Sequence, residues 1–125
     1  VQAREEVDHG MILFDYIIER DGNVELKQIE APQYNFGEPL EIFEQIYSHE
    51  RSVTESIECV ASMSEEECDM AARHFINWYI QEQVEEEASV DDIIKKMKMF
   101  GQDKSILYHI DIELGKREYT QHKYS

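Results

Sequence analysis

Three long segments of this chain carry apolar residues at helical spacing, and this periodicity limits the fold to a helical one. In the second segment the apolar stripe consists of Ile42, Ile46, Val53, Ile57 and Val60. Residues three and four positions apart share one face of a helix, so each stripe predicts one buried helix face. A chain of 125 residues is long enough for one domain with one core. We therefore expect an all-α protein that forms a single domain over residues 1–125.

The first helix is expected to run from the start of the chain to about Arg20. Its stop signal is the sequence of residues 21–23, in which Gly22 is placed to take the left-handed backbone conformation. The connection over residues 23–38 is long for a compact domain, and it suits a crossover between two parallel helices. Nothing near Val1 resembles an N-cap, so we expect the sequence to begin partway along a longer natural chain.

The second helix is expected to open at Pro39, a good first helical residue, and to end near Met63. Ser64 followed by Glu67 predicts a capping box that opens the third helix. That helix is expected to run to residue 100 and to stop at Gly101. A short fourth helix is expected over about residues 103–114, and residues 116–125 are expected to form a flexible tail.

The chain is strongly acidic, and its composition excludes several classes of protein. It has 28 Asp and Glu residues against 12 Lys and Arg residues, a formal net charge of -16. Nucleic acid phosphates would be repelled by this charge. No apolar run approaches the roughly 20 residues of a membrane span. Cys59 and Cys68 do not form a disulfide framework and are expected to be free thiols in a reducing compartment. We expect a cytoplasmic protein that binds neither nucleic acid nor membrane.

Polar residues interrupt the apolar stripe on all three long helices. Glu50 fills the stripe position between Ile46 and Val53 on the second helix. On the first helix, the stripe that continues through Leu13 and Ile17 includes Glu6 and His9. On the third helix, the same face passes through Glu82, Gln83 and Glu86.

Carboxylates on a core face are costly unless something neutralises them. A buried, unpaired carboxylate tends to protonate, and several that converge need a cation between them. Oxygen and nitrogen ligands suit a hard or borderline metal ion. The spacing of three residues places Glu6 and His9 on one side of a helix turn, and Gln83 and Glu86 repeat it. The joint pattern therefore predicts a metal site in the core of a helix bundle.

Taken one at a time, these residues have simpler interpretations. Glu50 alone would be a helix-end or subunit-interface residue, His9 alone would be a satisfied histidine, and the three glutamates 85–87 would be a solvated face. The remaining histidines show no ligand spacing to one another: His49, His74, His109 and His122.

The sequence motifs on these helices resemble those of the ferritin family. Residues 5–9, Glu-Glu-Val-Asp-His, resemble the E-E-x-x-H motif of the second ferritin helix, and His49-Glu50 matches the H-E of the third. Residues 75–79 with 82–87 look like the fourth helix of prokaryotic non-haem ferritins. The resemblance, which covers essentially the whole chain, implies a ferritin-like four-helix bundle with a long crossover and a short C-terminal fifth helix. It also implies that the first helix of the bundle is absent from this sequence.

The resemblance implies a di-iron centre that oxidises Fe(II) with dioxygen or peroxide. In ferritin-like proteins such centres are built from bundle-core carboxylates and Glu-x-x-His pairs. Glu6 is implied to bridge two irons, His9 to bind the first, and Glu50 to bind the second, with Gln83 and Glu86 beside it. A third, weaker iron site is implied to use Glu5, Glu82, Glu85 and Glu86. The Fe(III) product is implied to be stored as mineral in a homo-oligomeric shell of twenty-four subunits.

Two departures from related patterns refine this expectation. Val7 stands where bacterioferritins place a haem-binding methionine, and residues 83–86 do not read Glu-x-x-His, so no haem is expected. The family's first helix supplies one terminal glutamate ligand and a nearby tyrosine. Without it the first iron keeps only Glu6 and His9, so ferroxidase activity requires that the missing ligand be supplied.

Two alternatives stay open. The chain could be a structural shell subunit, or a truncated paralogue, without a working di-iron centre; shell assembly without fast oxidation would distinguish it. A rubrerythrin-like peroxidase would need a CxxC rubredoxin module and a Glu-x-x-His in the last long helix, and this sequence has neither.

Overall fold

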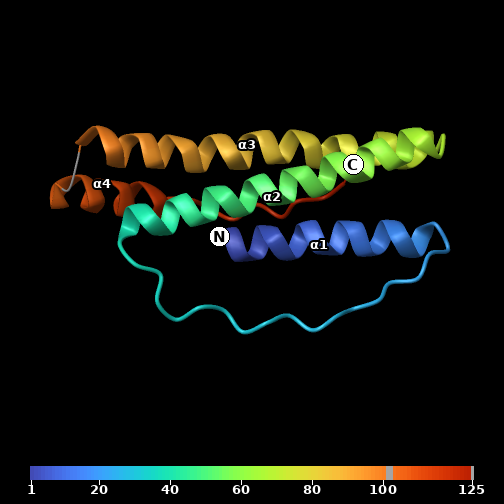
Figure 1. The fold of residues 1–125 in the computed structure, drawn as a ribbon, viewed down its shortest axis with the longest axis horizontal. Helices are drawn as coiled ribbons and strands as arrows, with labels where there is room; N and C mark the ends of the chain where they lie inside the picture. The colour runs from blue at the N-terminus through green and yellow to red at the C-terminus, as the bar shows by residue number, and fades with distance from the viewer. Residues whose placement is uncertain (101–102, 125) are drawn as a thin grey trace. The chain divides into compact units, whose positions relative to one another are not determined.

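The computed structural model describes residues 1–100 and 103–124, and these residues form helices joined by turns and loops. The helices are α1 (Gln2–Glu19), α2 (Pro39–Glu66), α3 (Met70–Phe100) and α4 (Lys104–Gly115) (Figure 1). No strand occurs in the described ranges, which confirms the predicted all-α class. The predicted helix stop at Gly101 lies outside the described residues. No helix in the described part of the chain is long and apolar enough to cross a bilayer.

The chain divides into two compact units, which we call the terminal unit and the central unit. The terminal unit contains residues 1–33 and the described residues from Asp111 onward, and the central unit contains Tyr34–Ile110. The single domain over residues 1–125 therefore stays a prediction. Residues 23–38, which connect α1 to α2, contain neither helix nor strand, as expected for a long connection.

The C-terminus of α1 is closed by a turn in which Asp21, not Gly22, takes the left-handed conformation, with φ of 57°. The backbone N–H of Gly22 donates to Ile17 O at 2.8 Å, and that of Asp21 donates to Ile18 O at 3.0 Å. This is the Schellman arrangement. The prediction for Gly22 was wrong because aspartate tolerates the left-handed region. Glycine is needed at position 22 for space, since a Cβ there would lie 2.7 Å from Ile17 Cγ2.

The central unit is built on α2 and α3, which pack against each other as an antiparallel pair (Figure 1). Its buried apolar side chains are Ala61, Phe75, Ile76, Tyr79, Val90, Ile94, Met97 and Ile110. The prediction for α2 was wrong in part, because Ile46 and Val60 are exposed. The covered face of α2 instead follows residues 50, 54, 57, 61 and 64, which recur at true helical spacing but are mostly polar or small.

The turn between α2 and α3 lies later in the chain than predicted. α2 continues to Glu66, and the Ser64 hydroxyl donates to Val60 O within that helix at 2.8 Å. Cys68 takes the left-handed conformation after α2, with φ of 56°. Asp69 Oδ1 accepts the backbone N–H of Ala72 at 3.0 Å and so caps α3. The predicted Ser64–Glu67 capping box was therefore wrong, because residues 64–66 extend α2 and the cap falls on Asp69.

Candidate metal centre

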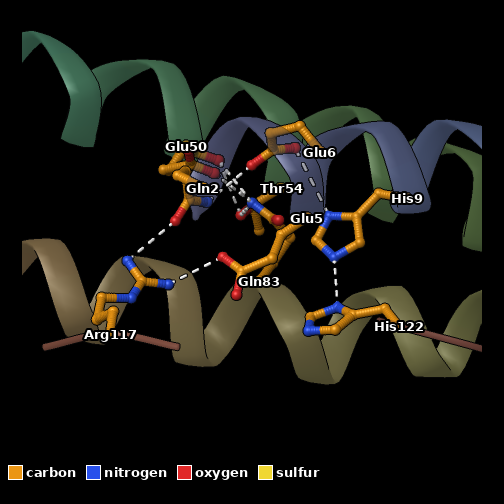
Figure 2. Close-up of polar contacts among 9 residues, drawn as sticks. All are labelled: Gln2, Glu5, Glu6, His9, Glu50, Thr54, Gln83, Arg117 and His122. Carbon is orange, nitrogen blue, oxygen red and sulfur yellow. Dashed lines mark hydrogen bonds and ion pairs between the residues drawn. The ribbon is translucent and has the colours of Figure 1, made fainter. Parts of the chain in front are cut away.

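On α1, the buried face carries Glu5 and His9, which are 7% and 8% exposed. Glu6 was expected on this face, but its side chain is 51% exposed. The covered positions of α1 follow residues 5, 9, 12 and 16, one position away from the predicted stripe through Glu6, Leu13 and Ile17. Glu6 remains next to His9 across one helix turn, with Oε2 3.6 Å from His9 Nδ1 (Figure 2). The E-E-x-x-H motif therefore divides into a buried Glu5 and a more accessible Glu6 beside the histidine.

Glu5 has a cationic partner from the other end of the sequence. Arg117 Nη2 lies 2.9 Å from Glu5 Oε2, and Arg117 Nη1 donates to Gln2 Oε1 at 3.1 Å (Figure 2). This ion pair neutralises a carboxylate that would otherwise be costly to bury. Sequence reasoning missed Arg117, because no local pattern links it to Glu5.

The segment that follows Arg117 is held along α1 by a second carboxylate. Asp8 Oδ2 accepts the Tyr119 hydroxyl at 2.8 Å and the backbone N–H of His122 at 2.9 Å. These hydrogen bonds, that of Tyr119 first, lower the pKa of the Asp8 carboxyl below its usual range. The same bond to Asp8 raises the pKa of Tyr119. We call residues 117–122 the C-terminal strap. The flexibility expected of residues 116–125 stays a prediction.

The strap brings a second histidine to His9. His9 Nε2 lies 2.9 Å from His122 Nδ1, and the ring centroids are 5.0 Å apart (Figure 2). The two residues are 113 positions apart in the chain. The sequence offered no spacing signal for His122, because ligand spacing is informative only within one element or a short loop.

In the central unit, α2 and α3 place Glu50 and Gln83 in contact. Both side chains are buried, at 9% and 5% exposure. Gln83 Nε2 lies 3.2 Å from Glu50 Oε2, 3.1 Å from Glu50 O and 3.3 Å from Thr54 Oγ1 (Figure 2). The structure thus joins two of the predicted site residues. Of the others on α3, Glu82 and Glu86 are half-buried and Glu85 is exposed.

Thr54 connects this buried pair to a hollow on the same unit. Its hydroxyl lies 2.6 Å from Glu87 Oε1, and Glu87 Oε2 lies 4.0 Å from Arg51 Nη1. The hollow has a volume of about 420 Å³ and is lined by Tyr47, Arg51, Thr54, Glu55, Glu58, Val84, Glu87, Ala88 and Asp91. Four of these side chains are acidic and one is basic, so the hollow favours cations over anions.

Both units therefore present ligands of the same chemical kind. α1 offers a carboxylate and an imidazole nitrogen 3.6 Å apart. α2 and α3 offer a buried carboxylate, an amide and further glutamates. Carboxylate and imidazole together suit borderline divalent ions such as Fe²⁺ and Zn²⁺.

Comparisons with known proteins agree with the motifs. The family described as "Ferritin-like domain" matches residues 1–100. The "Bacterial non-heme ferritin" of Bacteroides fragilis is 37% identical over 116 residues, which are 93% of this chain and 72% of that protein. The protein of the same description from Staphylococcus aureus (strain MRSA252) is 34% identical over 120 residues, 96% of this chain and 72% of that protein.

Solved structures give the same result at the level of the fold. A structure described as "Humanized Archaeal ferritin" matches with a TM-score of 0.93 and 42% identity, over 96% of this chain and 73% of that one. An open-pore ferritin from the hyperthermophilic archaeon Archaeoglobus fulgidus matches with a TM-score of 0.88 and 43% identity, over 91% and 70%. These matches support the predicted ferritin-like bundle.

Proposed function

This chain belongs to the ferritin family as a prokaryotic non-haem ferritin, and we propose that it stores iron and oxidises Fe(II) at a di-iron carboxylate centre. Iron is both the substrate and the cargo in this proposal. The observation that carries it is the buried Glu50, whose carboxylate lies 3.2 Å from the Gln83 amide. A buried carboxylate that accepts a hydrogen bond from an amide suits a cation as a further partner.

We assign the iron ligands as the resemblance implies. Glu6 bridges the two irons, His9 binds the first, and Glu50 binds the second with Gln83 and Glu86 beside it. The 3.6 Å between Glu6 Oε2 and His9 Nδ1 supports their assignment to one ion, because atoms bound about 2.0–2.1 Å from one metal lie roughly 3 Å apart.

A third and weaker iron site is assigned to Glu5, Glu82, Glu85 and Glu86. Glu85 is exposed, which fits a site that exchanges iron with solvent. Glu5 is buried and paired with Arg117, so an ion there has to compete with a guanidinium.

The carboxylates promote oxidation by favouring the product. Each Fe²⁺ gives up one electron, and negatively charged ligands stabilise Fe³⁺ more than Fe²⁺. Two Fe²⁺ reduce one dioxygen, with two protons, to hydrogen peroxide. Two further Fe²⁺ reduce hydrogen peroxide, with two protons, to two waters. A two-electron transfer to one oxidant molecule requires two ions held near each other, which is the role proposed for a bridging Glu6.

We propose that the centre is completed by a carboxylate from outside residues 1–125, supplied by a preceding segment or by a partner subunit. Haem plays no part, since Val7 stands at the position of the haem-binding methionine. The protein would work in the reducing cytoplasm, where Fe(II) is available.

We further propose that twenty-four copies assemble into a shell around the Fe(III) mineral. The connection between α1 and α2 supports assembly, because three of its large apolar side chains are almost fully exposed: Leu26 is 85% exposed, Ile29 92% and Tyr34 95%. Exposed apolar side chains grouped in this way mark subunit interfaces.

The test is Fe(II) oxidation under air, followed by absorbance as iron is added stepwise. The wild-type protein is expected to show a fast phase that saturates near two or three irons per chain. Glu50→Ala should remove most of the fast phase while the shell still assembles. The matched control is Glu44→Ala, because Glu44 lies on the same helix and its exposed ion pair with Lys98 contributes little.

Each result has a distinct meaning. If Glu50→Ala oxidises iron as fast as the control, the assignment of Glu50 is wrong. If the wild-type chain forms a shell but oxidises iron only at the rate of buffer, the structural-subunit alternative is correct and the ferroxidase proposal fails.

A further inference from the structure

We infer that His122 is a positioning residue for iron binding, which holds the His9 ring in the tautomer that carries its proton on Nε2 and binds a metal ion through Nδ1. The inference rests on the proposed function, in which His9 is an iron ligand. It assigns a role to the C-terminal strap, which is remote in sequence from every motif that identified the site.

The geometry of the His9 ring gives its two nitrogens separate neighbours. Nδ1 faces Glu6 Oε2 at 3.6 Å, which is too long for a hydrogen bond. Nε2 faces His122 Nδ1 at 2.9 Å, a normal hydrogen-bond length. A neutral imidazole carries its proton on one nitrogen only. The nitrogen that binds a metal must be the other one.

When a cation occupies the Glu6 side of the ring, the His9 proton therefore lies on Nε2. His122 Nδ1 is the acceptor for that proton. Metal-bound histidines commonly donate their second ring N–H to such a partner, which fixes the tautomer and the ring plane and strengthens the ligand. Here the partner is an imidazole from the strap.

His122 is itself held in place by contacts that do not involve its ring. Its backbone N–H donates to Asp8 Oδ2 at 2.9 Å, and Tyr119 donates to the same oxygen at 2.8 Å. Arg117 holds the start of the strap at Glu5, 2.9 Å away. Substitution of the His122 side chain therefore removes the ring acceptor while the strap keeps its other contacts to α1.

The first experiment measures Co²⁺ affinity by calorimetry on the complete, iron-free protein, with Co²⁺ as an oxidation-stable substitute for Fe²⁺. His122→Ala is expected to weaken binding at the His9 site by about 10- to 100-fold, the usual effect of losing a histidine's outer partner. His122→Asn should restore most of the affinity, because its Oδ1 is as many bonds from Cα as the histidine Nδ1 and accepts the same proton. His109→Ala, at an exposed histidine on α4, is the matched control and should bind as the wild type does.

The second experiment observes the tautomer directly, by magic-angle-spinning NMR of protein with ¹⁵N-labelled histidine. In Co²⁺-free protein loaded with diamagnetic Zn²⁺, His9 is expected to carry its proton on Nε2 in the wild type and in His122→Asn. In His122→Ala that single tautomer should be lost. Equal affinities for the wild type and His122→Ala, or an unchanged His9 spectrum, would overturn the inference.

The two proposals fail in different ways. His9→Ala should abolish Co²⁺ binding at this site, and adding His122→Ala to it should then cause no further loss of affinity. If His9→Ala leaves metal binding intact, then the assignment of His9 as a ligand is wrong, and the proposed function fails. If His9→Ala abolishes binding but His122→Ala does not weaken it, then only the role of His122 is wrong.

Discussion

Substituting Gln83 by glutamate should destabilise the metal-free protein and make added metal more stabilising. In the structure the Gln83 amide lies 3.2 Å from a Glu50 carboxylate oxygen, inside the α2–α3 pair. The variant replaces that hydrogen-bond donor with a second carboxylate and changes the side-chain volume very little. Two facing carboxylates repel each other unless a proton or a metal ion lies between them.

The size of the effect follows from the contacts. A hydrogen bond to a charged group contributes about 1.5–3 kcal/mol, and this contribution is lost. Repulsion adds to the loss but is limited, because the new carboxyl can bind a proton. For a glutamate with an ordinary pKa of about 4.3, protonation at pH 7 costs about 3.7 kcal/mol, and the O–H then restores a donor. We therefore expect Gln83→Glu to lower the free energy of unfolding by about 2–4 kcal/mol.

The assay is urea denaturation of metal-free and Co²⁺-loaded protein, with Gln81→Glu as the matched control. Gln81 is exposed on the same helix, two residues away, so its substitution adds the same charge without the contact. Co²⁺ should stabilise Gln83→Glu more than it stabilises the wild type or the control. The reasoning is refuted if the metal-free Gln83→Glu protein is as stable as Gln81→Glu, or if Co²⁺ stabilises it no more than the wild type.

Three further predictions concern the fold. Cys68→Gly should stabilise the protein by about 0.5–1 kcal/mol in urea denaturation, because Cys68 has φ of 56° and glycine adopts that conformation without strain; a lower urea midpoint would contradict this. Ile76→Ala should cost about 2–5 kcal/mol in the same assay, since Ile76 is 2% exposed, and a cost below 1 kcal/mol would contradict its place in the core. The backbone N–H of Ser105 donates to Asp103 Oδ1 at 2.9 Å, and this hydrogen bond lowers the pKa of the Asp103 carboxyl. The cap therefore stabilises α4 fully at pH values above the ordinary carboxyl pKa of 3.8, and this stabilisation is lost as the pH falls through the lowered pKa. Asp103→Asn keeps an acceptor without a charge and should remove that part of the acid dependence, measured by helicity between pH 2 and 6; an unchanged profile would contradict the assignment.

Helical periodicity predicted the helices and the buried face of α3 well but misplaced the buried faces of α1 and α2. On α1 the covered face passes through Glu5 rather than Glu6, and on α2 it passes through Ala61 rather than Val60. The cause is the same in both helices. The stripe was traced through the apolar residues, whereas the residues at its centre are acidic, polar or small. On the faces for which we propose a metal site, hydrophobicity is a poor guide to burial.

The sequence correctly predicted that a left-handed residue ends α1, but it placed this residue at Gly22 rather than at Asp21. Within residues 1–100 and 103–124, the non-glycine residues with positive φ both follow helices: Asp21 follows α1 and Cys68 follows α2. The position of the left-handed residue depends on the position at which the helix ends. The end of a helix is set by tertiary packing as well as by local sequence, and residues 64–66 extend α2 beyond its predicted end.

Of the candidate site, the resemblance implied that Gln83 lies beside the ion at Glu50, and the helical spacing placed Glu6 next to His9. The sequence could not predict the contacts of Arg117 and His122. Both contacts depend on a segment without helix or strand, residues 117–122, that folds back on α1 from more than a hundred positions away in the chain. No periodicity connects such residues.

Under the proposed iron sites, Arg117 and His122 have opposite consequences for metal binding to α1. The guanidinium is paired with Glu5, so an ion at Glu5 would have to displace the start of the strap. The imidazole contacts His9, so an ion at His9 would favour the docked strap. Coupling between sites is reciprocal, so occupation of either proposed site would weaken ion binding at the other. The strap would thereby give α1 negative cooperativity between its two proposed metal positions.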